Sequence, residues 1–80
     1  MWYVYMLKSE KKKWYYIGST NRLTERLSEH NKGLTPSTKA YTPLRLVWNK
    51  EFNSEKEARN YEQRLKHKRI EKEDIIKKLG

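Results

Sequence analysis

The sequence predicts a mixed α/β (α+β) domain in which a small, largely antiparallel three-stranded sheet is flanked by helices. Apolar and polar residues alternate in three stretches, near residues 2–7, 14–18 and 44–52, and this period of two is typical of strands. Apolar residues recur at helical spacing after the second and third stretches. The expected order is therefore β-β-α-β-α-α, and a chain of 80 residues suffices for one domain, over residues 1–80.

The first two strands are expected to form a hairpin across a lysine-rich loop over residues 8–13. Tyr5 and Leu7 share one face of the first strand, and Trp14 and Tyr16 share one face of the second. A symmetric loop sets Leu7 opposite Trp14 and Tyr5 opposite Tyr16. Two phenols would then lie side by side.

A helix is expected directly after Gly18, which ends the second strand. Thr20 or Asn21 can cap its start, and Gly33 suits the left-handed position after its end. Its inward stripe consists of Leu23 and Leu27. A row at a spacing of four residues carries Arg22, Arg26 and His30.

The second half of the chain predicts a loop, a strand and two helices. A polar loop over residues 34–43 contains two prolines that oppose regular structure, and the strand after it places Leu44, Leu46 and Trp48 on one face. Ser54 and Glu57 form a capping box for the next helix. The buried stripe of that helix is Ala58, Tyr61 and Leu65, with Glu62 at its edge, and Ile70, Ile75, Ile76 and Leu79 indicate a short third helix.

The charge indicates a polyanionic partner. Nineteen Lys and Arg face ten Asp and Glu, which leaves a formal charge of +9, and both halves of the chain carry part of it. Charge spread over a folded domain suits phosphate contacts, because each neutralised phosphate releases counterions. The alternative is that the charge only maintains solubility.

Two motifs and three single residues, in this order along the chain, carry a family resemblance. Tyr3-Val4-Tyr5 and Tyr16-Ile17-Gly18 precede Arg26, His30 and Glu62, and in this combination the chain resembles a GIY-YIG nuclease domain, especially the small stand-alone members. The resemblance covers nearly the whole chain, including the loop tract 37–44. One departure is that Tyr3 and Val4 stand where the family name spells glycine and isoleucine, so Tyr3 puts bulk beside the proposed site.

The resemblance implies a metal-dependent endonuclease that hydrolyses DNA phosphodiesters, with repair or recombination as its setting. Glu62 would then bind Mg²⁺ or Mn²⁺, and the planar fork of Arg26 would contact a phosphate. By resemblance Tyr5 is the preferred general base, Tyr16 orients the phosphate or water, and His30 polarises Tyr5 or receives a proton. A phenol with an ordinary pKa near 10 needs help to lose its proton.

Each site residue also has an ordinary explanation. Tyr5 and Tyr16 suit a cross-strand aromatic pair, Arg26 suits a pair with Glu29, and Glu62 one with Lys66. His30 alone would more often be structural. For nucleic-acid binding we single out Arg22, Lys39 and Tyr41; the last two either contact phosphate and base or only order their loop.

Two rival functions remain open. The same basic surface and aromatic strands suit a non-catalytic module that holds single-stranded nucleic acid. The chain also suits a subunit that supplies protein contacts to a larger repair complex, and a homodimer is compatible with double-strand cutting. We expect a soluble cytoplasmic protein without a membrane span, because the chain has no cysteine and its apolar start is too short for one.

Overall fold

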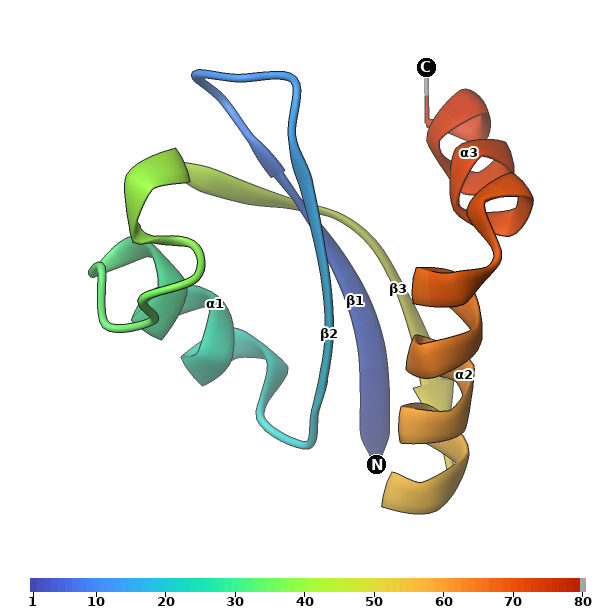
Figure 1. Ribbon diagram of the computed structural model, residues 1–80. Coiled ribbons are helices and arrows are strands. Elements are labelled where there is room, and N and C mark those ends of the chain that lie inside the picture. The colour runs from blue at the N-terminus through green and yellow to red at the C-terminus, as the bar shows by residue number, and fades with distance from the viewer. Residues whose placement is uncertain (80) are drawn as a thin grey trace.

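The computed structural model describes residues 1–79 and confirms the predicted order of elements. The chain forms β1 (Trp2–Ser9), β2 (Tyr15–Thr20), α1 (Leu23–Asn31), the short 3-10 helix η1 (Lys39–Tyr41), β3 (Leu44–Phe52), α2 (Glu55–His67) and α3 (Arg69–Lys78) (Figure 1). The strands form one antiparallel sheet in the order β2-β1-β3. Within residues 1–79 every helix is too short or too polar to cross a membrane.

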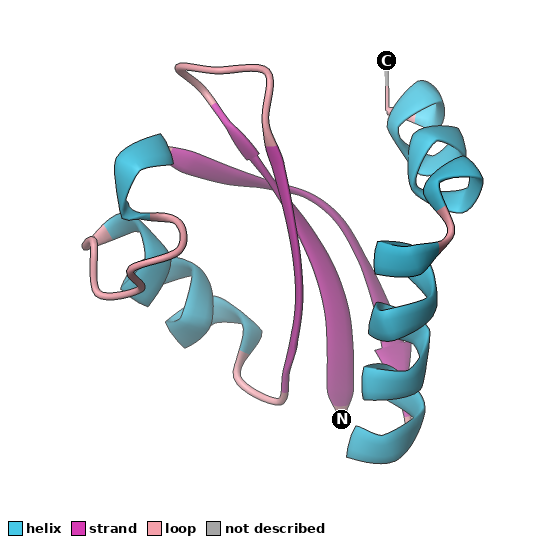
Figure 2. Ribbon diagram, in the orientation of Figure 1, coloured by secondary structure: helices cyan, strands magenta, loops and turns pink. Residues whose placement is uncertain are grey.

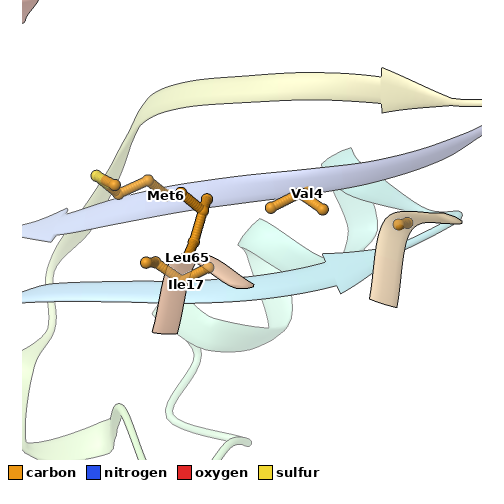
Figure 3. Close-up of a cluster of buried hydrophobic side chains, with 5 residues drawn as sticks. Val4, Met6, Ile17 and Leu65 are labelled. Atoms are coloured by element: carbon orange, nitrogen blue, oxygen red, sulfur yellow. The ribbon is translucent and has the colours of Figure 1, made fainter. Parts of the chain in front are cut away.

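Helices cover both faces of the sheet, as Figure 2 shows, with α1 on one side and α2 and α3 on the other. The central strand β1 is therefore apolar on both faces. Val4 and Met6 pack with Ile17, Ala58 and Leu65 under α2 (Figure 3). The alternate residues of β1, Tyr5 and Leu7, pack with Leu44 on the α1 side. Residues 4–7 are each at most 2% exposed, so β1 forms the middle layer of the molecule.

The predicted hairpin register is wrong by two residues. Tyr5 pairs with Gly18, and Leu7 pairs with Tyr16. The cause is the turn, because the Ser9 hydroxyl accepts hydrogen bonds from the amides of residues 11 and 12 and moves the centre of the loop toward the C-terminus. A shift of two keeps every side chain on its face. The two phenols are diagonal neighbours, with ring centroids 6.3 Å apart.

The prediction that Trp48 shares a face with Leu44 and Leu46 is also wrong. Leu44 and Leu46 pack on the α1 side as expected, whereas Trp48 packs against the α2 side. An irregularity in the β1–β3 pairing explains the difference: Met6 pairs with Trp48 and its neighbour pairs with Leu46. One extra residue on β3 forms a bulge, and the residues beyond it change face.

The helix ends follow the sequence in part. The Ser54 hydroxyl accepts the Glu57 amide proton as expected, and Gly33 takes the left-handed conformation after α1, with φ of 76°. The start of α1 differs, since Arg22 is the N-cap residue and no side chain caps the helix. The Thr20 hydroxyl instead accepts the Arg22 amide proton, which closes the turn before the helix.

Candidate active site

Tyr5 and Gly18 are pressed together at the centre of the site. The Tyr5 side chain is 2% exposed, and a Cβ atom added at position 18 would lie 2.5 Å from the Tyr5 hydroxyl oxygen. Any larger residue would collide with the phenol or with the Tyr16 ring, which lies 3.0 Å from the same point. Glycine at this position therefore makes room for the buried phenol.

A buried hydrogen-bonded chain extends from Tyr5 into the loop after α1. The Tyr5 hydroxyl lies 3.1 Å from His30 Nε2, and His30 Nδ1 lies 2.8 Å from the Thr38 hydroxyl. His30 and Thr38 are both fully buried. Because the Thr38 hydroxyl donates to the carbonyl of Thr35 at 3.4 Å, it accepts the proton of Nδ1. His30 Nε2 is then the acceptor for Tyr5.

The pKa shifts agree with this direction of donation. Burial and the Tyr16 phenol raise the pKa of Tyr5 to about 12, against a lowering effect of Arg26 and a further rise caused by Glu62. Burial and the charge of Arg26 lower the pKa of His30, with Glu29 opposing them. At neutral pH Tyr5 is therefore a protonated donor and His30 an uncharged acceptor.

Tyr16 lies beside this chain. Its ring centroid is 5.1 Å from that of His30, and on its other side Trp14 stacks at 6.2 Å. The residue is half-buried, unlike Tyr5. Tyr16 is thus held by three ring contacts, with His30, Trp14 and Tyr5, and still reaches the surface.

Arg26 is held by a carboxylate on its own helix. Its Nη1 lies 3.0 Å from Glu29 Oε1, and Nη2 of Arg22 lies 3.6 Å from the second oxygen of Glu29. The hydrogen bond from Arg26 lowers the pKa of Glu29, so the carboxylate is ionised at neutral pH. Two guanidinium groups therefore share one acid and keep an excess of positive charge at this end of the site.

Glu62 approaches β2 from the opposite face. The Ser19 hydroxyl donates to Glu62 Oε1, and the Lys66 ammonium lies 2.6 Å from Oε2. The Glu62 side chain is only 15% exposed. Gly18 faces α1 and Ser19 faces α2, so the candidate site straddles the edge strand β2.

The oxygen atoms around Glu62 suit a hard divalent cation. One carboxylate and one hydroxyl are the kind of ligands that Mg²⁺ accepts while keeping several waters. Within residues 1–79 no group of three or more His, Asp or Glu gathers into a metal cage. A cation at this place would be held through the Glu62 carboxylate, beside the Ser19 hydroxyl. Lys66 already places one positive charge on this carboxylate.

The other predicted contact residues lie around this centre. Arg22 is exposed and joins it through Glu29, and the Lys39 side chain lies over Gly33. The Tyr41 ring stacks on Trp14, with centroids 3.9 Å apart and planes at 7°. The Lys12 ammonium lies over the same ring at 5.2 Å. Base stacking on Tyr41 would have to displace one of these two neighbours.

Two residues of the site were missing from the set predicted from sequence. Thr38 fixes the His30 ring and Ser19 bonds to Glu62. Their signal was weak but present, because Ser19 directly follows Tyr16-Ile17-Gly18 and Thr38 lies in the loop tract that resembles small relatives. Tyr3, the bulky residue of the first motif, pairs with Thr20 and is half-buried.

Comparison with known proteins places the chain among its relatives. The family described as the GIY-YIG catalytic domain matches residues 1–74. A UPF0213 protein of Streptococcus pneumoniae is 37% identical over 76 residues, covering 92% of this chain and 76% of that protein. The solution NMR structure of a UPF0213 protein from Bacillus halodurans is 32% identical with a TM-score of 0.58, covering 96% of this chain and 84% of the other.

Proposed function

The chain belongs to the GIY-YIG family, and from that premise we propose that it is a metal-dependent endonuclease that hydrolyses DNA phosphodiesters. The observation that carries the proposal is the buried Tyr5–His30–Thr38 chain at the edge strand β2. A purely structural tyrosine pair needs no imidazole with a fixed acceptor nitrogen. Such an arrangement suits a group that must give up a proton.

We assign Tyr5 as the group that takes the proton from the attacking water. With a pKa near 12, Tyr5 does not hold a free phenolate at neutral pH. Its hydroxyl proton instead moves to His30 Nε2 as the water proton arrives at the phenol oxygen. The water oxygen forms a bond to phosphorus, the bond to the leaving sugar oxygen breaks, and that oxygen takes a proton from solvent. Thr38 keeps His30 Nε2 free to accept.

Arg26 is assigned to the phosphate. Its guanidinium is always charged and binds phosphoryl oxygens with a planar pair of donors, and the contact with Glu29 holds it in place. The half-buried Tyr16 hydroxyl is assigned to orienting the phosphate or the water. Arg22 and Lys39, both exposed, are assigned to neighbouring phosphates, with Tyr41 supporting the loop that carries Lys39.

Glu62 is assigned as the residue that holds Mg²⁺ or Mn²⁺. A bound divalent ion would supply charge neutralisation on the phosphoryl and leaving oxygens. The Ser19 hydroxyl orients one carboxylate oxygen of Glu62. Lys66 must release the other oxygen, or share it, when a cation is bound.

A non-catalytic binding module is the second candidate. The observation that favours it is the Lys66 ammonium on Glu62, because an ion pair alone accounts for that carboxylate. We further propose DNA as the polymer, the cytoplasm as the location because the chain has no cysteine, and repair or recombination as the setting. A homodimer or a larger repair complex would supply any second cut.

The test is cleavage of supercoiled plasmid and of a branched duplex with Mg²⁺, Mn²⁺ or chelator. Wild type is compared with Arg26→Ala and Glu62→Gln, and Glu57→Gln on the exposed part of the same helix is the matched control. If the protein is an endonuclease, wild type and control should cut only with metal. The two site variants should then bind without cutting. If none cuts and all bind with steep salt dependence, the binding module replaces it.

A further inference from the structure

A groove separates the β1–β2 hairpin from α3, at the end of the molecule where both lie in Figure 1. It consists of two cavities of about 520 and about 280 Å³. Tyr15 and Ile76 line both cavities, so the two are neighbours on the surface. None of the residues assigned above to the reaction lines either cavity.

The groove is strongly basic. Its cationic residues come from five places in the chain: Lys8, Lys13, Arg45, Arg69 and Lys72. Its acidic residue, Glu73, pairs with Arg69 at 3.3 Å. Among residues 1–79 the other four cations form no ion pair with a carboxylate. A row of uncompensated cations in a concave surface is complementary to a phosphate backbone.

Aromatic and apolar side chains form the rest of the lining. The half-exposed Tyr15 ring lies there beside Val47, whereas the Trp14 ring stacks on Tyr41 on the α1 side of the sheet. A duplex presents its phosphates and sugars outward, whereas an unpaired strand also presents base faces that stack on aromatic rings. The combination of cations with the Tyr15 ring therefore favours single-stranded nucleic acid over duplex.

The groove lies on the same face of β2 as Glu62. Tyr15, Ile17 and Ser19 alternate along that face, and Ser19 donates to Glu62. At about 3.3 Å per residue, the four steps from Tyr15 to Ser19 span about 13 Å. Because α2 covers Ile17, a strand that leaves the Glu62 side of the site would pass along the outer edge of β2 and reach the groove within a few nucleotides.

We propose that this groove binds an unpaired single-stranded arm of the nucleic-acid substrate next to the bond that is cut. The inference rests on the proposed function for its substrate and extends it, since it names a branched or tailed nucleic acid as the preferred substrate class. The site at Glu62 engages the duplex junction, and the groove holds the displaced strand.

The experiment measures binding in chelator, where no cleavage is required. Labelled DNA is offered as a blunt duplex and as the same duplex with a single-stranded tail, over a range of salt concentrations. The groove variant is Lys13→Gln with Lys72→Gln, and the matched control is Lys56→Gln with Lys77→Gln, which removes the same charge from α2 and α3 outside both cavities. Circular dichroism checks folding, and Lys13→Glu alone, in the exposed hairpin loop, serves as a second variant.

Wild type should bind the tailed duplex more tightly than the blunt one. The groove variant should lose this preference, with affinity for the tailed duplex about tenfold weaker and a salt slope lower by about 1.4. The control should weaken both substrates alike. Equal losses in the groove and control variants, or no tail preference in wild type, would overturn the proposal. Because binding is measured without metal, lack of cleavage would count only against the endonuclease.

Discussion

The two faces of β2 carry different chemistry. On the α1 face, Tyr5, His30 and Thr38 form a buried and uncharged chain. On the α2 face, Glu62 is ionic, with a hydroxyl and an ammonium on its two oxygens. Burial fixes proton positions because a low dielectric makes a misplaced hydrogen bond costly, whereas partial exposure lets one cation replace another. One edge strand thus separates a buried, uncharged face from an ionic face.

The proposed role of the α1 face is tested most directly by Tyr5→Phe. Removing the hydroxyl should lower the cleavage rate about 10²- to 10⁴-fold, because the attacking water loses its proton acceptor, with DNA affinity unchanged. Single-turnover cleavage and binding in chelator measure the two effects. Tyr3→Phe, two residues earlier on the same strand, is the control and should keep its rate. A Tyr5→Phe protein that cuts at the wild-type rate would remove the α1 face from the reaction.

A smaller loss is expected for Thr38→Val. Without the Thr38 hydroxyl, His30 Nδ1 loses its buried partner and the ring tautomer is no longer fixed. The cleavage rate should fall about tenfold or more, and the free energy of unfolding should fall by about 1–3 kcal/mol. Thr38→Ser restores the hydroxyl and should recover most of both. If Ser fails to recover the rate while the fold is intact, the methyl group and not the hydroxyl matters.

The pH dependence of stability should test the buried imidazole on the α1 face. Burial lowers the folded-state pKa of His30 below its unfolded value of 6.5, so the stability of neutral His30 is fully present above pH 6.5 and is lost as pH falls below it. Urea unfolding of wild type should therefore show a decline from pH 7 toward pH 5. His30→Gln should show a shallower decline, and identical slopes would contradict a buried neutral imidazole.

The smallest effect is expected on the α2 face, from Lys66→Met. An exposed lysine four residues from a glutamate contributes only about 0.3–0.5 kcal/mol, so the Mg²⁺ concentration for half-maximal cleavage should fall about twofold. Lys56→Met on the same helix should leave it unchanged. A rise in that concentration would show that Lys66 assists the bound substrate rather than competing with the cation.

Local patterns in the sequence were sufficient for the elements of the fold. Alternation predicted three strands, apolar spacing predicted three helices, and Ser54 and Gly33 marked ends that the structure confirms. The register and the strand face were beyond such patterns. Both depended on single local events, the Ser9 turn and the β3 bulge, that leave the apolar pattern nearly unchanged.

The sequence by itself determined the family and the candidate site residues: the two tyrosine motifs, Arg26, His30 and Glu62 stand in an order that indicates the family. Only the tertiary structure decided how they meet. Tyr5 reaches His30 across 25 positions and Glu62 reaches Ser19 across 43, and contacts at such separations depend on how helices pack on a sheet. The tertiary structure alone also set Thr38 behind His30, because a buried ring nitrogen must find a partner wherever the fold provides one.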